Sequence, residues 1–282
     1  MSAAATTTAI GDALAASTDA IGAAGAETPR LDAEVMLGAI TGLDPAAIAA
    51  HPERPLSAPE AREYAAMVRR RVRREPVAYI TGRKGFRHID LSVDPRVLVP
   101  RPETELLVEV ALEIQPTAVL DVGTGSGAVA LAVADELPAA RVVATDTSPA
   151  ALSVARANAR RLGLAGRVTF EQGTLPPAAP NPGFDLVLAN LPYVSEDEWR
   201  GLAPEVRDHE PRDALVAGPA GLEAISSLLD ELAAVPGWPR AVALEHGIGQ
   251  AEAVAGLAAA AGFEDVERRR DLAGTERVVL AR

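Results

Sequence analysis

The sequence contains no cysteine, and aromatic residues make up only 3% of its 282 residues. Without cysteine the chain cannot use disulfides, thiolate chemistry or sulfur ligands for a metal. The four histidines lie far apart and show no H-x-x-x-H spacing, so we predict no metal site. No apolar run approaches the roughly 18 residues of a membrane span, and the N-terminus lacks a basic stretch followed by an apolar core. We therefore expect a soluble, cytoplasmic protein without membrane insertion.

The chain also lacks a positive net charge: 39 acidic residues outnumber 27 basic ones, which gives a formal net charge of -12. This balance argues against a general nucleic-acid binder, which needs a basic surface to neutralise phosphates. One segment is an exception, the basic cluster made of Arg69, Arg70, Arg71, Arg73, Arg74, Arg83, Lys84 and Arg87. A solvated helix face followed by a hairpin explains this pattern better than a phosphate-binding patch does.

The first part of the chain reads as helical. Short breaks interrupt it near Pro29, Pro45 and Pro55, and Ser57 with Glu60 forms a capping box for a further helix. Between residues 76 and 100, apolar residues approximately alternate around two glycines, which predicts a β-hairpin. We expect a helical domain at 1–75, a hairpin linker at 76–100 and a larger domain at 101–282.

The larger domain alternates helix-like and strand-like segments. Helices are predicted at 103–114, 126–136, 149–162, 221–233 and 249–261, and strands at 118–122, 141–145, 168–171, 184–189, 241–245, 263–267 and 277–280. Such alternation predicts an α/β fold with a parallel, doubly wound sheet, whose ligands bind at the carboxyl ends of the strands.

A glycine-rich loop follows the first predicted strand of this domain. Gly123, Gly125 and Gly127 let the backbone turn tightly and approach a ligand closely. Asp146, one strand later, lies where an acid can accept hydrogen bonds from a ribose. This motif suits a nicotinamide dinucleotide as well as S-adenosylmethionine. Asp121 favours the latter, because its sulfonium and amino groups are cationic.

The stretch Asn190-Leu-Pro-Tyr193 follows the strand predicted at 184–189. The Asn190 side-chain oxygen and the Leu191 carbonyl are two adjacent acceptors whose backbone is stiffened by Pro192. Two fixed acceptors match one NH2 group, and the Tyr193 ring offers a face for a flat amide or base. Holding both N–H bonds would orient a weakly nucleophilic nitrogen for methyl transfer. A plain strand-ending turn is the alternative.

Nearly the whole chain resembles the PrmC/HemK family, which methylates a glutamine side-chain amide in peptide chain release factors. The resemblance includes DVGTGSGAVALAVA and NLPYV. It also includes REPVAYITGRKGF at 74–86, VLVPRPETE at 97–105, RDHEPRDALVAGPAGLEAI at 207–225, EHGIGQAEAV at 245–254 and DLAGTERVVLAR at 271–282. The EPVAYITG and VPRPETE segments are the most specific, because generic methyltransferases lack them.

This resemblance implies a seven-stranded, Rossmann-like methyltransferase domain, a hairpin linker and an N-terminal helical domain that docks the substrate. It implies that Gly123, Thr124, Gly125, Ser126, Gly127 and Asp146 bind S-adenosylmethionine. Asn190, Leu191, Pro192 and Tyr193 would clamp the glutamine of the release factor's Gly-Gly-Gln motif, with Asn190 also facing the cofactor. Pro102 and Glu103 would lie on the approach to the pocket or simply begin a helix. The resemblance leaves the oligomeric state open.

Two positions depart from the family pattern. Leu191 stands where the family usually has proline, which keeps the carbonyl but loses rigidity. Thr174 stands where the family tends to have an acid near the adenine amine, and a hydroxyl binds that amine more weakly than a carboxylate. These changes would suit a divergent member or a paralogue with another protein substrate.

Three other functions remain open at this stage. NLPY also resembles the tetrapeptide of ribosomal RNA adenine dimethylases, so an adenine N-methyltransferase is the nearest alternative. A nicotinamide-dependent dehydrogenase would explain the glycine loop but not Asn190 to Tyr193. A binding protein that retains the fold without turnover is the third.

Overall fold

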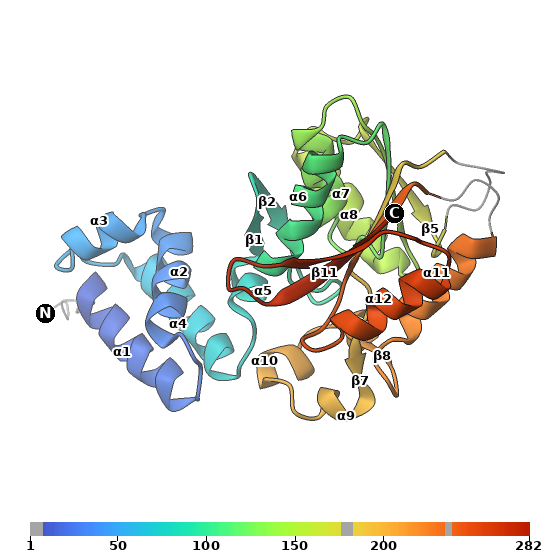
Figure 1. Cartoon of the computed structure of the whole chain (residues 1–282). Helices are drawn as coiled ribbons and strands as arrows, with labels where there is room; N and C mark the ends of the chain where they lie inside the picture. The colour runs from blue at the N-terminus through green and yellow to red at the C-terminus, as the bar shows by residue number, and fades with distance from the viewer. Residues whose placement is uncertain (1–7, 176–182, 235–238) are drawn as a thin grey trace, which may run out of the picture. The chain divides into compact units, whose positions relative to one another are not determined.

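A computed structural model describes residues 8–175, 183–234 and 239–282 of the chain (Figure 1). The chain divides into two compact units. One consists of Met1–Gly82 and Pro204–His209, and the other of Arg83–Ala203 and Glu210–Arg282. The described residues include no helix long and apolar enough to cross a membrane.

The first unit is helical, as predicted. Its helices are α1 (Ile10–Ala23), α2 (Pro29–Thr41), α3 (Pro45–Ala50), α4 (Ala58–Val72), α5 (Val77–Thr81) and the short α10 (Pro204–Arg207). The Ser57 hydroxyl accepts from the Glu60 amide and the Glu60 carboxylate accepts from the Ser57 amide, so the predicted capping box begins α4. Apolar side chains from α1 to α5, including Leu14, Met36 and Ile80, form one core.

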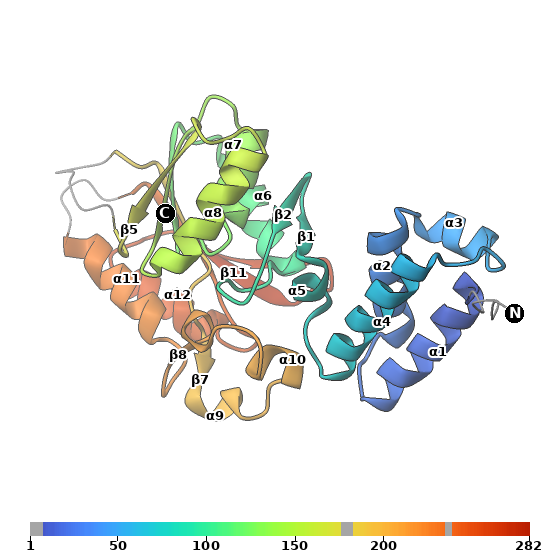
Figure 2. The same ribbon diagram turned by 180° about the vertical axis from the view of Figure 1, so that it is seen from behind.

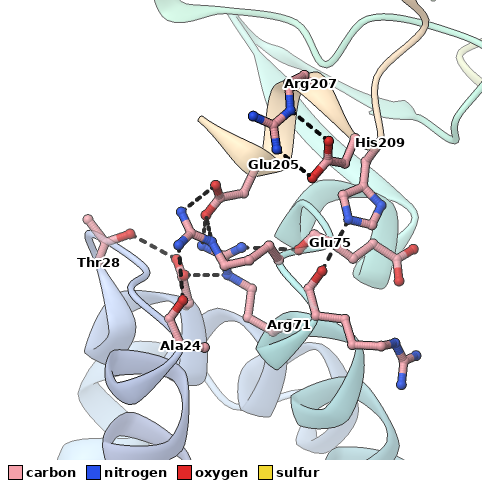
Figure 3. Close-up of polar contacts among 11 residues, drawn as sticks. Ala24, Thr28, Arg71, Glu75, Glu205, Arg207 and His209 are labelled. Atoms are coloured by element: carbon pink, nitrogen blue, oxygen red, sulfur yellow. Dashed lines mark hydrogen bonds and ion pairs between the residues drawn. The ribbon is translucent and has the colours of Figure 1, made fainter. Parts of the chain in front are cut away.

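A buried polar cluster joins α10 to α2 and α4 within this unit (Figure 3). Arg71 Nε donates to Asp32 Oδ2 over 2.7 Å, and Arg71 Nη2 donates to Glu205 Oε1 over 2.8 Å. Arg74 binds the same carboxylate through Nε and Nη2, over 2.8 and 2.5 Å. Arg71 is only 5% exposed. This part of the basic cluster is therefore buried and paired rather than a solvated helix face.

The predicted hairpin is present but shorter than expected. Strand β1 (Arg83–Phe86) pairs antiparallel with β2 (Ile89–Ser92), and Arg87 and His88 form the turn. Arg87 has a φ of 51°, in the left-handed region that such turns require. The sequence interpretation was wrong for residues 77–81, which form helix α5 rather than part of the hairpin.

The second unit contains a seven-stranded sheet, as predicted. Its order is β10-β11-β9-β6-β3-β4-β5. The strands are β3 (Ala118–Val122), β4 (Arg141–Asp146), β5 (Val168–Gln172), β6 (Leu186–Ala189), β9 (Ala241–Glu245), β10 (Val266–Arg270) and β11 (Glu276–Ala281). The expectation of an all-parallel sheet was wrong for β11, which runs antiparallel to both neighbours.

Helices cover both faces of this sheet, as a doubly wound fold requires (Figures 1 and 2). On one face lie α6 (Glu105–Ile114), α7 (Ala128–Glu136) and α8 (Pro149–Arg161), preceded by the 3₁₀ turn η1 (Pro102–Thr104). On the other, α11 (Glu223–Ala234) and α12 (Ala251–Ala260) share a core with alternate residues of the strands, such as Leu120, Ala189 and Leu244. The residues between these on each strand therefore face α6 to α8.

A small additional sheet follows the Asn190 turn and was not predicted. Strands β7 (Val194–Ser195) and β8 (Val216–Gly218) pair in parallel. The connection between them carries α9 (Glu196–Trp199), α10 and the 3₁₀ turn η2 (Arg212–Ala214). This connection is where the chain contributes α10 to the helical unit.

Candidate functional site

A cavity of about 400 Å³ lies at the carboxyl edge of the large sheet. This volume is within the range of small-molecule sites, roughly 300 to 1,000 Å³. Most of the residues predicted from the sequence line it, namely Gly123, Thr124, Gly125, Ser126, Asp146, Thr174, Asn190, Leu191 and Pro192. Strand order explains this, because β6, β3 and β4 are neighbours and end at the same edge.

The glycine loop between β3 and α7 has the conformation that its glycines permit. Gly123, Gly125 and Gly127 all have positive φ angles, of 73°, 55° and 85°. The amides of Gly123 and Thr124 both donate to the Thr145 carbonyl over 2.9 Å, which fixes the loop to β4. A Cβ on Gly125 would meet nothing within 4 Å, so the loop leaves open space at that residue.

Two carboxylates at the ends of β3 and β4 face this cavity. Asp146 accepts from the amides of Gly125 and Ser148 over 2.9 and 2.8 Å, and burial nevertheless raises its pKa. Asp121 is only 2% exposed, and burial raises its pKa to about 7 although Thr124 and Ala130 donate to it. A cationic ligand would favour the ionised form of both groups. This arrangement fits the positive charges and the ribose of S-adenosylmethionine.

The turn that begins at Asn190 lies against the glycine loop. A methyl group on Gly123 would be 2.9 Å from Leu191 Cδ2 and 3.4 Å from the Asn190 carbonyl oxygen. Asn190 Nδ2 donates to the Thr104 hydroxyl over 3.0 Å. No described residue donates a hydrogen bond to Asn190 Oδ1. Because Asn190 lines the cavity, its carboxamide combines a fixed nitrogen with an oxygen that can accept from a ligand.

Two predicted site residues do not line the cavity, Gly127 and Tyr193. Gly127 caps the N-terminus of α7 instead. The Tyr193 ring lies beside the turn after β9, where a methyl group on Gly247 would be 3.2 Å from Tyr193 Cδ2. Burial raises the pKa of the Tyr193 hydroxyl, and Gln250 Nε2 donates to the Tyr193 carbonyl over 2.9 Å. Thr174 lines the cavity, and its carbonyl accepts from Thr145 Oγ1 over 2.7 Å.

The cavity also has lining residues that the sequence did not single out as site residues. One set lies on the segment before α6, and a second on η2 and α11: Arg96, Val97, Leu98, Pro100, Arg101 and Thr104, then Asp213, Ala214, Ala224, Ser227, Leu228 and Glu231. The VLVPRPETE motif could have indicated that the first set lies at the site. The amphipathic pattern of α11 indicates only a helix packed on the sheet, so nothing in the sequence marks the second set. Pro102 and Glu103, which the sequence did single out, belong to η1 and do not line the cavity.

The described residues contain no group of three or more His, Asp or Glu side chains placed to hold a metal ion. The cavity presents carboxylates, backbone amides and the Asn190 carboxamide. Such groups can bind a cationic cofactor and orient a planar nitrogen.

Comparison with known proteins agrees with this geometry. Residues 12–82 match the PrmC N-terminal domain, and residues 119–209 match a methyltransferase domain. The chain is 43% identical to a release factor glutamine methyltransferase of Moorella thermoacetica, over 93% of this chain and 94% of that one. It is 42% identical to the Caulobacter vibrioides protein of the same name, over 94% and 93%.

A solved structure supports the fold independently of close sequence similarity. The hMettl16 catalytic domain, in complex with MAT2A 3′UTR hairpin 6, aligns with a TM-score of 0.56. The alignment covers 81% of this chain and 84% of that one at 15% identity, so it speaks for the methyltransferase fold alone. From the sequence identities to its relatives and their coverage, this chain belongs to the release factor glutamine methyltransferase family.

Proposed function

We propose that this protein transfers a methyl group from S-adenosylmethionine to the side-chain amide nitrogen of the glutamine in the Gly-Gly-Gln motif of peptide chain release factors. Family membership supports the reaction and the substrate class. The observation that carries the proposal is the Asn190 carboxamide, which lines the cavity beside the glycine loop with its nitrogen already bound to Thr104.

The glycine loop and Asp146 would hold the cofactor, which supplies an electrophilic methyl group when bound. Asp146 would accept from the ribose hydroxyls, and the open space at Gly125 lets the ligand approach the backbone. Asp121 would add negative charge to the cavity, and Thr174 would offer a hydroxyl.

The substrate amide is a weak nucleophile, because its nitrogen lone pair is delocalised into the carbonyl. Asn190 Oδ1 and the Leu191 carbonyl would each accept one of its N–H bonds, which orients the nitrogen toward the methyl group. The same two acceptors stabilise the positive charge that grows on the nitrogen during attack. The helical unit would dock the release factor, in agreement with the match of residues 12–82 to the PrmC N-terminal domain.

A direct test combines purified protein, radiolabelled S-adenosylmethionine and purified release factors, followed by mass mapping of the modified residue. Label should appear on the glutamine of the Gly-Gly-Gln motif and disappear when that glutamine is replaced by glutamate. Undermethylated ribosomal RNA, tested across a salt series, probes the adenine alternative. Methylation of RNA with none on the release factor would overturn the proposal.

A further inference from the structure

Glu245 is a buried carboxylic acid that the mechanism above does not use. It ends β9 and is 0% exposed, and among the described residues neither carboxylate oxygen has a partner with full hydrogen-bond geometry, although the Thr104 hydroxyl lies near enough to lower the pKa of the acid. It does not line the cavity. An unpartnered buried carboxyl group is costly, so its presence here calls for a functional explanation.

Strand pairing places this group next to Asn190. Ala189 of β6 pairs with Leu244 of β9, so Asn190 and Glu245 follow as the next neighbours on the two parallel strands. Side chains alternate along each strand, and Ala189 and Leu244 both face α11 and α12. Asn190 and Glu245 therefore share the opposite face, which is covered by α6, and Thr104 immediately precedes that helix.

Thr104 lies between the two groups. It is 4% exposed and accepts from Asn190 Nδ2, which leaves its own hydroxyl proton to donate. Burial raises the pKa of Glu245 to about 7, and the nearby Thr104 hydroxyl opposes that rise. Three charged groups also influence the pKa of this acid: Glu103 raises it, and Arg277 and Arg101 lower it. The Glu245 carboxylate in turn raises the pKa of the Tyr193 hydroxyl.

Resting on the proposed function, we propose that Glu245 is a positioning residue that sets the direction of the hydrogen bond between Thr104 and Asn190. An ionised carboxylate only accepts hydrogen bonds, so the Thr104 hydroxyl turns its proton to Glu245 and presents its oxygen to Asn190. Asn190 Nδ2 then faces Thr104, and Oδ1 faces the substrate. If the Asn190 carboxamide were turned by 180°, its own NH2 group would face the substrate NH2 group. The hydrogen bond to the substrate would then be lost.

The chain offers a graded set of variants for a test. Glu245→Met keeps the volume without an acceptor, and thermal unfolding of the variant checks that it remains folded. We expect kcat for release-factor methylation to fall by about 10- to 100-fold, because the reactive geometry loosens. Thr104→Val should give a similar loss. Glu245→Gln should lie between wild type and Glu245→Met, because its amide oxygen can still accept from Thr104.

A double-mutant cycle separates positioning from a structural role. In an Asn190→Ala background, Glu245→Met should cause little further loss of kcat, because the carboxamide it orients is gone. His246→Gln, a change at the next residue, which is equally buried, serves as the control and should leave kcat close to wild type. Calorimetric binding of S-adenosylmethionine should be unchanged in Glu245→Met.

The pH profile supplies an independent readout. Wild-type kcat should fall as the pH drops below about 7, as Glu245 gains a proton, and Glu245→Gln should lose that limb of the profile. Equal additional losses from Glu245→Met with and without Asn190 would overturn the inference, as would full kcat in Thr104→Val. If the wild-type protein methylates the release factor, either of these two results overturns only the role of Glu245 and leaves the proposed function intact. A wild-type protein without this activity would count against the proposed function instead.

Discussion

At the scale of single residues, Asn190 and Asp146 line one cavity but have different contacts. Asn190 binds Thr104, and no described residue donates to its Oδ1, whereas the oxygens of Asp146 accept from backbone amides of the loop and of Ser148, which precedes α8. Asn190 is therefore suited to a substrate N–H group, and Asp146 to a ligand that lies on the loop.

This difference predicts separable defects. Asn190→Ala should lower kcat by on the order of 100- to 1,000-fold, as for the loss of a group that stabilises charge in a transition state, with cofactor affinity nearly unchanged. Asp146→Ala should chiefly weaken cofactor binding. Calorimetry with S-adenosylmethionine and single-turnover methylation measure the two effects. Equal losses of cofactor affinity in both variants would contradict these roles.

Residue types and spacing were enough to predict that the glycine loop, Asp146 and Asn190 lie at one cavity, because all three stand at strand ends. Thr104 and Glu245 were not predicted as partners of Asn190. Their relation depends on β6 lying beside β9 and on α6, which Thr104 precedes, contacting both strands. Neither strand order nor helix packing can be read from the spacing of residues along the chain.

At the scale of elements, the glycine loop and the Asn190 turn support each other. Gly123 and Gly125 both have positive φ angles, so alanine strains the backbone at either position by about 1 kcal/mol. Only at Gly123 would the added Cβ also contact the turn, at Leu191 Cδ2. The two glycines thus form a matched pair for testing that contact.

We expect Gly123→Ala to reduce methyl transfer because Leu191 must swing away from the loop and change the cavity wall, whereas Gly125→Ala places its methyl group in the space left for the ligand. Both variants should lose a similar amount of thermal stability. Adding Leu191→Ala should recover part of the Gly123→Ala defect. Steady-state kinetics and thermal unfolding of Gly123→Ala and Gly125→Ala, each with and without Leu191→Ala, would measure the recovery. Recovery of Gly125→Ala by Leu191→Ala to the same extent as Gly123→Ala would argue against the contact.

Elements with strong patterns were predicted closely, whereas weak or short ones were not. The strands at 118–122 and 241–245 agree with β3 and β9 because both are apolar runs buried on two faces. Residues 77–81 form only one helical turn, which is too short to show a helical period. The reversal of β11 follows from its direct connection to β10, and hydrophobicity alone carries no strand direction.

At the scale of the whole molecule, Glu205 of α10 connects a late segment of the chain to the helical unit, because it accepts hydrogen bonds from Arg71 and Arg74 of the first 82 residues. Burial opposes its ionisation, but hydrogen bonds from Arg74 and Arg71 outweigh burial and lower its pKa. A lowered pKa in the folded state means that its contribution to stability is present above the unfolded pKa, about 4.3, and is lost as the pH falls.

Glu205→Gln should therefore destabilise the protein at pH 7 by about 1 to 3 kcal/mol, and the difference from wild type should shrink below about pH 4. Glu196→Gln is a matched control, because Glu196 also pairs with an arginine, Arg212, but both side chains are about half exposed. That change should cost less than about 1 kcal/mol. Calorimetric unfolding at several pH values measures the stability loss of each variant. Equal losses in the two variants would show that burial does not strengthen the Glu205 ion pair.

The place of α10 in the chain has a consequence for synthesis on the ribosome. Residues 1–82 are made first, yet Arg71 and Arg74 receive their glutamate only when residue 205 has emerged. At about 5 to 20 residues per second, the intervening 122 residues (83–204) take roughly 6 to 24 s to translate. During this interval Arg71 has its partner Asp32 within residues 1–82, but Arg74 still lacks the carboxylate that it binds in the folded chain.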